Sequence, residues 1–257
     1  MHSPFGQRLK HWRRVRRVSQ LDLSLRSGVS PRHVSFLETG RSRPGRDVIL
    51  RLADALDIPP RDRNVLLEAA GLPPAYGERN LDDAALTPFR HMLDRMLAAH
   101  APFPALLITA WWELVEANPP ARRMMGMPEA GPLPSVSLLD ALLESGRERF
   151  VDYPTTAHTL LDRLAREAAA NPDPRLLQVL ERTRERLAAV PRPRHLPEEV
   201  GPALRTQMRA GDQVLTTVAA VARFTDALDA TLDDLRVELL FPADDATEAW
   251  FRAQAGD

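Results

Sequence analysis

The sequence predicts a multidomain protein in which an all-α domain of five helices, residues 1–72, precedes an α+β domain, residues 89–257. The length is sufficient for two domains of ordinary size. Helical apolar spacings with start and stop signals fill the first 72 residues, whereas β-branched runs and helices alternate in the rest. The formal charge changes sign at the same boundary, from +7 over residues 1–72 to −8 over 73–257.

The charge distribution indicates a polyanionic partner for the first domain. Residues 1–72 hold 14 Lys and Arg against 7 Asp and Glu, and the remainder holds 20 against 28. A basic domain favours nucleic acid, and an acidic one does not. The structural alternative is a solvated basic face. We favour DNA because the basic residues coincide with the helix pattern described below.

Composition and missing motifs exclude several classes of protein. The absence of cysteine excludes disulfides and thiolate metal sites and fits a reducing cytoplasm. The N-terminus lacks the apolar region of a signal peptide, and the most apolar run, residues 103–112, is too short to span a bilayer. The signatures HExxH, GxxxxGK[ST] and GxSxG do not occur. We therefore expect a cytoplasmic protein that is not an enzyme, needs no cofactor or metal, and does not bind membranes.

The first helix is predicted over residues 5–16. Phe5, Leu9 and Trp12 recur at the spacing of one apolar stripe. Arginines surround this stripe and are expected to reach DNA phosphates: Arg8, Arg13, Arg14, Arg16 and Arg17.

Residues 19–40 predict two short helices joined by a tight turn, over about 20–26 and 31–39. Ser19 is suited to cap the first helix, with Asp22 three residues on as in a capping box. Ser30 is suited to cap the second, and Pro31 falls at its first position, where a missing N–H costs nothing. Gly28 permits the turn between them. This is the helix-turn-helix plan, in which the second helix lies in the DNA major groove.

The second of these helices is expected to read bases with one face. Val34 and Leu37 should face the core, which leaves Arg32, His33 and Phe36 on the opposite side. Arg32 can pair with guanine, and Phe36 can contact a thymine methyl group. A dimer or intramolecular contact for Phe36 and a solvated role for His33 remain open alternatives.

Basic residues also follow this second helix. Gly40 suits its C-terminal cap. Arg41 and Arg43 come next and are expected to position the DNA backbone rather than to read sequence.

Two further helices, over about 46–56 and 61–70, complete the first domain, and residues 73–88 are predicted to be a linker. The second domain should begin with a helix over 88–100, strands over 105–109 and 112–117, and a helix from 119 to 125 capped by Asn118. Helices over 138–144, 156–170 and 174–188 and a proline-rich loop over 191–197 follow. Strands over 203–209, 213–224 and 235–241, with a hairpin at 210–212, and a helix over 246–254 end the chain.

Residues 5–71 resemble the Cro/repressor, or XRE, type of helix-turn-helix domain. The resemblance is carried by Ser19-Gln20, Gly28-Val29-Ser30, Phe36-Leu37-Glu38, Gly40-Arg41 and Arg43-Pro44. It implies that Gln20 contacts a phosphate and braces the recognition helix. Leu23-Ser24 replaces the family's usual alanine beside the leucine, and serine is small enough to pack there. The expected DNA-binding residues are Ser19, Gln20, Ser30, Pro31, Arg32, His33, Phe36, Arg41 and Arg43.

The order of strands and helices in the second domain resembles a PAS-like domain, in which a five-stranded antiparallel sheet and its helices enclose an apolar pocket. Residues 112–118, WELVEAN, and 232–244, LDDLRVELLFPAD, are similar to the MmyB-like transcription regulators. The chain lacks the long insertion that many members carry within the helix-turn-helix. The resemblance implies a small apolar ligand such as a fatty acid. The expected lining, for which a filled core is the alternative, is Trp112, Met124, Met125, Phe150, Val218, Phe224 and Leu239.

These features together predict a homodimeric, sequence-specific transcription regulator that binds double-stranded DNA, expected to be a palindromic operator. One recognition helix reads only a few base pairs, so two half-sites require two copies. The alternative is a small-molecule binding protein whose helix-turn-helix serves as a protein-interaction module, and a third, weaker one is an enzyme built on the second domain. The operator, the ligand and the dimer interface are not specified by the sequence.

Overall fold

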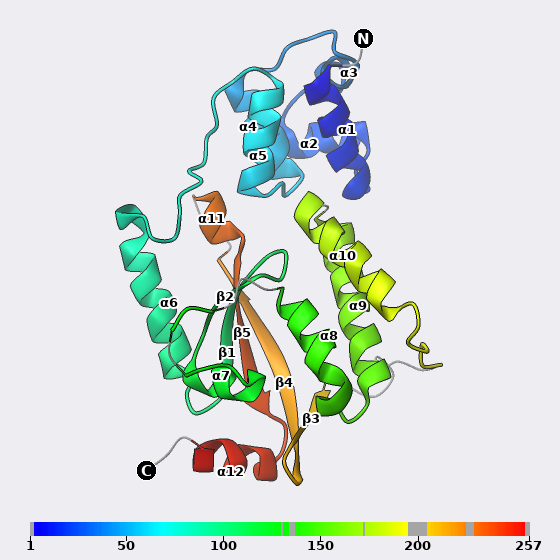
Figure 1. The fold of residues 1–257 in the computed structure, drawn as a ribbon. Coiled ribbons are helices and arrows are strands. Elements are labelled where there is room, and N and C mark those ends of the chain that lie inside the picture. The colour runs from blue at the N-terminus through cyan, green and yellow to red at the C-terminus, as the bar shows by residue number, and fades with distance from the viewer. Residues whose placement is uncertain are drawn as a thin grey trace. The chain divides into compact units, whose positions relative to one another are not determined.

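The computed structural model describes residues 3–129, 131–133, 137–171, 173–194, 205–224 and 229–254 (Figure 1). The chain divides into two compact units. The first combines Met1–Asp83 with Phe224–Asp233, and the second combines Ala84–Arg223 with Asp234–Asp257. The predicted fold class is confirmed, since a five-helix domain is followed by a domain with a five-stranded antiparallel sheet. A segment close to the C-terminus nevertheless belongs to the N-terminal unit, which the sequence did not indicate.

The five helices of the first unit lie within two residues of their predicted bounds. They are α1 (Pro4–Val15), α2 (Gln20–Ser27), α3 (Pro31–Thr39), α4 (Arg46–Ala55) and α5 (Pro60–Ala69). The predicted stripe of α1 joins the core, where Phe5 and Leu9 are fully buried. Gly6 lets α1 cross the end of α3 closely, because a Cβ there would lie 2.6 Å from the carbonyl oxygens of Leu37 and Glu38. This crossing fixes the recognition helix against α1.

The predicted caps start and end the two central helices. Ser19 and Asp22 form a complete capping box at α2, and Ser30 caps α3 with Pro31 at its first position. Gly28 and Gly40 end these helices in the left-handed conformation, with φ of 66° and 76°. The local sequence therefore sets the turn and both helix directions.

Part of the predicted linker is held in place by α5 and by the distant segment. Asn64 is buried, and its side chain accepts hydrogen bonds from the backbone of Ala75 and Tyr76. Gly77 bridges Asp229, and Arg79 pairs with the buried carboxylate of Asp229 at 3.0 Å. Residues 75–79 are thus ordered parts of the first unit rather than a free connection.

The second unit is built on a sheet with the strand order β2-β1-β5-β4-β3, antiparallel throughout. The predicted hairpin is present, with Gly211 at φ 62° between paired Ala210 and Gln213. The strands are β1 (Ala105–Thr109), β2 (Leu114–Ala117), β3 (Arg205–Ala210), β4 (Gln213–Arg223) and β5 (Leu235–Pro242).

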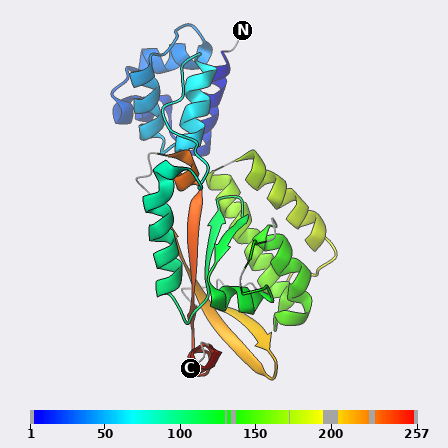
Figure 2. The ribbon, with the colours of Figure 1, turned by 60° about the vertical axis from the view of Figure 1, so that its left-hand side comes forward.

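Helices cover both faces of this sheet. Figures 1 and 2 show α6 on one side and the layer that contains α8 and α9 on the other. One apolar cluster of the unit lies among α8, α9 and α10, and another lies between the sheet and the helices α7 and α8. The helices are η1 (Ala84–Leu86), α6 (Thr87–Ala99), α7 (Pro119–Met125), α8 (Leu138–Arg149), α9 (Tyr153–Ala170), α10 (Pro174–Leu187) and α12 (Asp245–Gln254).

The structure corrects several predicted bounds. Strand β2 begins at Leu114 rather than at 112, because Trp112 adopts φ 65° in a turn after β1. Helix α8 continues to Arg149 rather than ending at 144. Gly146 does not end the helix; it makes room for the Phe150 ring, which would lie only 2.7 Å from a Cβ at this position. The four-residue helix α11 (Ala230–Asp233) was not predicted. Residues 203–204 of the predicted strand and 195–197 of the predicted loop lie outside the described residues.

Candidate nucleic-acid interface and ligand cavity

Helix α3 presents the predicted reading face to solvent. Val34 and Leu37 are fully buried, whereas Arg32 is exposed and His33 and Phe36 are half-buried. This arrangement follows from the helical period, which places residues three and four apart on one side. The structure brings the three predicted readers together on one outward face, and their contacts with bases stay a prediction.

Phe36 organises the arginines around it. Its ring centroid lies 5.2 Å from the guanidinium carbon of Arg32 and 5.9 Å from that of Arg41. A cation near an aromatic face is held by the ring quadrupole. Arg43 is exposed beyond Arg41, and the His33 Nε2 lies 3.4 Å from the Ser42 hydroxyl. Phe36 therefore holds a cation from the start of α3 and another from the segment after the helix on one surface.

The two capping serines are engaged at the helix starts. Ser19 Oγ accepts from the Asp22 backbone at 3.0 Å and donates to its carboxylate at 2.6 Å. This side-chain hydrogen bond lowers the pKa of Asp22. Ser30 Oγ accepts from the His33 backbone at 3.3 Å, and Pro31 is exposed beside it. Ser19 and Ser30 therefore act as helix caps in the structure, and their contacts with DNA stay a prediction.

A buried carboxylate braces the recognition helix from behind. Arg13 donates to both oxygens of Glu38, at 2.7 and 3.1 Å, and Gln20 donates to Oε2 at 2.7 Å. The hydrogen bonds to Glu38 raise the pKa of Arg13, although burial opposes this. Glu38 thus ties α3 to both α1 and α2. The bracing predicted for Gln20 is observed, whereas its phosphate contact stays a prediction.

Two of the five arginines expected to reach phosphates are hydrogen-bonded to other parts of the first unit. Arg13 is engaged with Glu38, and Arg16 donates to the carbonyl oxygens of Leu56 and Asp57 at 2.9 and 2.7 Å. Helical periodicity does not reveal such tertiary partners, and a phosphate contact of either arginine stays a prediction. Arg8, Arg14 and Arg17 are exposed.

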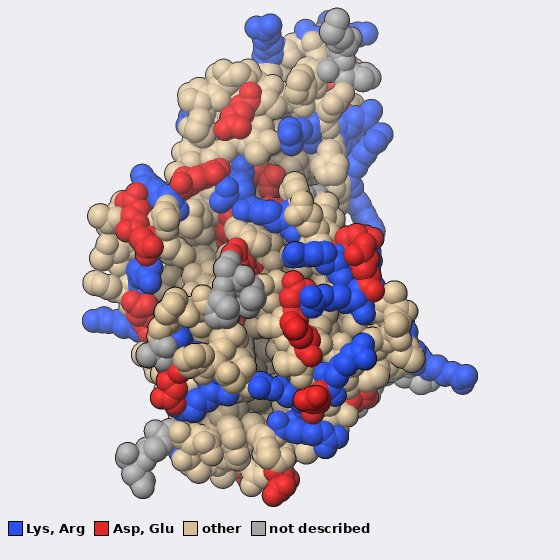
Figure 3. Space-filling view, viewed as in Figure 1, with Lys and Arg blue, Asp and Glu red and all other residues tan. Residues whose placement is uncertain are grey.

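Acidic and basic side chains are interspersed on the face seen in Figure 3, so the acidic surplus of residues 73–257 forms no single patch there. Many of them are close pairs, such as Arg186 with Asp140 at 3.4 Å.

A cavity of about 80 Å³ lies between the sheet and the helices of the second unit. Four residues of the predicted lining meet there, namely Trp112, Met124, Met125 and Phe150. The remaining lining residues come from β1, α8, α9, β3, β4 and β5: Leu106, Leu138, Leu142, Thr156, Leu160, Arg163, Thr206, Met208, Thr217, Ala219, Glu238 and Leu240. The structure thus provides a hollow where the sequence expected one, and its occupation by a ligand stays a prediction.

Three residues of the predicted lining lie elsewhere. Thr217 and Ala219 of β4 face the cavity, so Val218 between them points to the other side of the sheet. The same alternation turns Leu239 of β5 away. Phe224 follows the end of β4 and belongs to the first unit. The prediction of these three as cavity residues was wrong.

A compact group of charges borders the cavity. Arg163 pairs with Glu238 and, at 3.1 Å, with Glu167, which Arg236 also holds at 2.7 Å. The Trp112 indole N–H donates to Glu167 at 2.9 Å, and the guanidinium carbon of Arg163 lies 4.6 Å from the centroid of the Trp112 ring. Burial would raise the pKa of Glu167, but attraction to the two arginines and their hydrogen bonds hold it below its usual range. The group is electrically balanced.

Sequence reasoning missed the polar members of this site. Arg163 and Glu167 stand four residues apart on α9, a spacing that indicates a helical ion pair but not its burial. Arg236 and Glu238 are two residues apart in β5 and therefore share one face of the strand. The sequence does not show that this face is buried. Their arrangement depends on the sheet register.

A smaller cavity of about 30 Å³ adjoins the first and shares six lining residues with it. Arg149 and Met127 are among its own lining residues. The shared residues are Met124, Met125, Leu138, Leu142, Phe150 and Met208.

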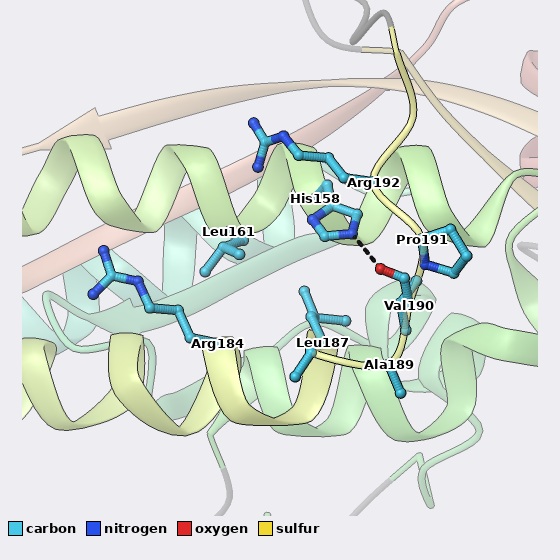
Figure 4. A pocket seen from close by; sticks show the side chains of 9 residues that line it. His158, Leu161, Arg184, Leu187, Ala189, Val190, Pro191 and Arg192 are labelled. Atoms are coloured by element: carbon cyan, nitrogen blue, oxygen red, sulfur yellow. Dashed lines mark hydrogen bonds between the residues drawn. The ribbon is translucent and has the colours of Figure 1, made fainter.

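A third, open depression of about 580 Å³ lies between α9 and α10 (Figure 4). Figure 4 shows Leu161, Leu187 and Arg184 around it, with His158 bonded through Nε2 to the Val190 carbonyl at 3.0 Å. Arg184 and Arg192 point away from the hydrogen bond between His158 and Val190.

The described residues hold neither a membrane-spanning helix nor a candidate metal site. None of the helices in the described ranges combines the length and apolar character of a bilayer-spanning segment. No group of three metal-binding side chains was found within the same ranges.

The first domain has recognisable relatives. Residues 4–66 match the family of helix-turn-helix domains. An uncharacterised HTH-type transcriptional regulator of Bacillus subtilis, RghRB, is 38% identical over 77 residues, which is 30% of this chain and 53% of that protein. The chain thus spans about half of this relative. The restriction-modification controller protein C.AhdI of Aeromonas hydrophila is 39% identical; the match covers 24% of this chain and 92% of that one, with a TM-score of 0.23.

The second domain decides the family. Residues 89–253 match the MmyB-like transcription regulator ligand binding domain. This match covers more than half of the chain and includes the sheet, the helices and the cavity described above. Together with the helix-turn-helix match, it confirms both resemblances seen in the sequence. The chain belongs to the MmyB-like transcription regulators.

Proposed function

We propose that this transcription regulator binds a defined DNA operator as a homodimer and that an apolar ligand in its second domain adjusts the binding. It acts in the cytoplasm, where chromosomal DNA is accessible, and it has no catalytic role. The observation that carries the DNA-binding part is the recognition helix. Its outward face holds Arg32, His33 and Phe36, and Glu38 braces it from within.

Dimerisation is argued from the size of the reading surface. One recognition helix contacts only a few base pairs, so a specific site needs two helices about 34 Å apart, one turn of DNA. Two copies of the same chain are related by a two-fold axis, which makes the operator palindromic.

Selection of binding sites from a random DNA library tests this proposal without knowledge of the regulated genes. The full chain should enrich two inverted half-sites with centres about 10 base pairs, or a multiple of this, apart. Affinity for the selected site should fall steeply with salt, because each neutralised phosphate releases a counterion. Equal binding to all sequences would contradict sequence-specific recognition.

The ligand part of the proposal rests on the cavity between the sheet and the helices. Its lining is mostly apolar, and four of the seven methionines in the chain border it or the adjoining cavity. Methionine side chains adapt to flexible apolar ligands. The family resemblance supplies a fatty acid as the candidate.

Native mass spectrometry of the full chain tests the ligand part. A co-purified lipid and a change of operator affinity on addition of a fatty acid are the expected results. A bare protein whose operator affinity ignores fatty acids would contradict it.

The alternative is a small-molecule binding protein whose helix-turn-helix contacts another protein. The arginines beside Phe36 favour DNA over this alternative, because a cluster of cations on one surface suits a polyanion. The site selection above separates the two, since the alternative predicts no enriched sequence.

A further inference from the structure

We propose that the turn of residues 110–112, between β1 and β2, couples the cavity of the second unit to the DNA-binding unit. Trp112 moves when the cavity is filled, and Asp234 passes this movement to the segment that precedes it in the chain. The inference rests on the ligand part of the proposed function and names the residues through which a ligand acts. It does not depend on the chemical class of that ligand.

The turn holds Trp112 in an unfavourable backbone conformation. Its φ of 65° lies in the left-handed region, which bulky residues rarely adopt. The conformation is kept by neighbouring groups, since the indole N–H donates to Glu167 at 2.9 Å and the Trp112 carbonyl accepts from the Leu138 amide at 2.7 Å. The turn therefore has a second arrangement available, which it adopts when these contacts are displaced.

The cavity cannot take up a ligand unless its walls move. Its volume is about 80 Å³, whereas pockets for small molecules measure about 300–1,000 Å³. Trp112 lines the cavity and is the largest of the fully buried side chains that the structure describes. Among the lining residues, all of which the structure describes, only Trp112 has a positive φ. A ligand that needs the larger space binds only the moved state, which is the differential affinity that a switch requires.

The turn is tied to Asp234 at two points. The backbone N–H of Ala110 donates to the Asp234 carbonyl at 2.6 Å. The guanidinium carbon of Arg175 lies 3.5 Å from the centroid of the Trp111 ring, and its Nη2 lies 4.0 Å from the Asp234 carboxylate. A shift of the turn therefore acts on both the backbone and the side chain of Asp234.

Arg236 connects the Trp112 side chain to the same peptide group. Its Nη1 donates at 2.7 Å to Glu167, the acceptor of the indole, and its Nη2 donates to the Ala110 carbonyl at 3.3 Å. The Arg236 side chain is only 6% exposed, so water does not readily replace these partners. Loss of the indole bond thus reaches Ala110, and with it Asp234, through one residue.

Asp234 directly follows a helix that belongs to the first unit. Helix α11 ends at Asp233 and contacts α5, and the N–H of Ala230 at its start donates to the Gly77 carbonyl at 2.8 Å. A displacement of Asp234 therefore pulls on a covalent junction with a helix that the DNA-binding unit holds. The chain itself carries the movement from one unit to the other.

Operator binding of the full chain with and without saturating decanoate tests this inference. Fluorescence anisotropy with the selected operator gives the coupling factor, which is the ratio of the two dissociation constants, and calorimetry gives the affinity for decanoate. Trp112→Phe keeps an aromatic wall but removes the indole N–H. Trp111→Leu removes the contact with Arg175 and leaves the cavity lining intact, because Trp111 does not line it.

Trp250→Leu is the matched control. Trp250 is likewise a half-buried tryptophan of the second unit, and it lies in α12 against Phe251. This variant should keep the affinity for decanoate and the coupling factor of the unmodified protein.

We expect a coupling factor of roughly 5–150 in the unmodified protein, the usual range for coupled sites. In Trp112→Phe and Trp111→Leu it should fall to within about twofold of one, while operator affinity without decanoate is unchanged. Both variants should still bind decanoate, which also shows that the second domain is folded. Decanoate should accelerate amide exchange of residues 230–236 in the unmodified protein but not in these two variants.

Two results would overturn the inference. One is a full coupling factor in both variants. The other is loss of decanoate binding by Trp111→Leu, which would mean that the turn only shapes the cavity; Trp111→Leu decides the matter if Trp112→Phe alone loses decanoate. Both results leave the proposed ligand function standing. If decanoate left the operator affinity of the unmodified protein unchanged, that function itself would be contradicted, and the inference with it.

Discussion

Gln20 donates a hydrogen bond from Nε2 to the Oε2 atom of Glu38 across 2.7 Å, which joins the first helix of the helix-turn-helix to the recognition helix. Arg13 approaches the same carboxylate from α1 with two further bonds. Glu38 is only 3% exposed at its side chain, so its charge is satisfied by these donors rather than by water. The orientation of the reading face therefore depends on a residue that does not itself face DNA.

Replacing Glu38 with Gln should loosen the recognition helix. Arg13 would lose its charged partner, at a cost of about 2–3 kcal/mol, because a removed partner leaves a partly buried charge unpaired. Amide hydrogen exchange of α3 should accelerate accordingly. Glu68→Gln on the exposed side of α5 is the control, and equal exchange in both variants would show that the brace is unimportant.

Replacing Arg32 with Ala should reduce affinity for the selected operator by roughly 1–3 kcal/mol and relax one base position. The physical reason is the loss of a bidentate pair with a base edge. Competition binding with selected and random DNA measures the effect, with Arg252→Ala in α12 as the control. A loss of the same size on random DNA would show that Arg32 contacts only phosphate.

Phe36→Leu distinguishes two roles of the aromatic ring. Leucine keeps an apolar contact for a thymine methyl but removes the platform that holds Arg32 and Arg41. We expect Phe36→Leu and Phe36→Ala to weaken binding to random DNA alike, by about 0.5–1 kcal/mol for each arginine released. If leucine restored full operator affinity, the thymine contact would be the main role. Filter binding at fixed salt provides the measurement.

Glu167→Gln should destabilise the second domain at neutral pH and remove part of its acid sensitivity. The pKa of Glu167 lies below its usual range in the folded state. Its stabilising contribution is therefore complete above about pH 4.3, the unfolded value, and is lost as pH falls through the lower folded value. Removing one partner of a buried pair costs about 3–5 kcal/mol.

Urea unfolding of the unmodified protein and the variant between about pH 7 and pH 3, across the range in which a carboxylate titrates, measures this effect. The difference between them should shrink as the pH is lowered. Glu144→Gln at an exposed position of α8 should leave both the stability and its pH dependence unchanged. A constant difference across the range would mean that the charge of Glu167 is not what stabilises the domain.

The sequence predicted the helices of the first domain well because their signals are local. Ser19 with Asp22, Ser30 with Pro31, and the glycines 28 and 40 define starts and ends within a few residues. The reading face of α3 follows from the same period. Glu38 and Gly6 could not be assigned in this way, since their roles arise only where α1 and α3 cross.

The cavity was predicted only in part because β4 gives no clear alternation. Residues 214–222 are apolar or small on both faces, so the pattern does not tell which side a residue occupies. A register shift between Leu107 and Ile108 and the turn at Trp112 change the pairing at the other edge. Met124 and Met125 of α7 and Phe150 directly after α8 were easier to place, since only one side of their segments can face the sheet.

The contribution of residues 229–233 to the first unit has a consequence for synthesis on the ribosome. The five-helix core is encoded within the first 72 residues, but Arg79 meets its partner Asp229 only 150 residues later. At about 5–20 residues per second, the ribosome reaches that partner roughly 8–30 s after Arg79. During this interval the helix-turn-helix has been synthesised, but the segment around Arg79 still lacks its contacts with residues 229–231. Thr231 donates to the Arg79 carbonyl at 2.7 Å, so this contact can form only near the end of translation.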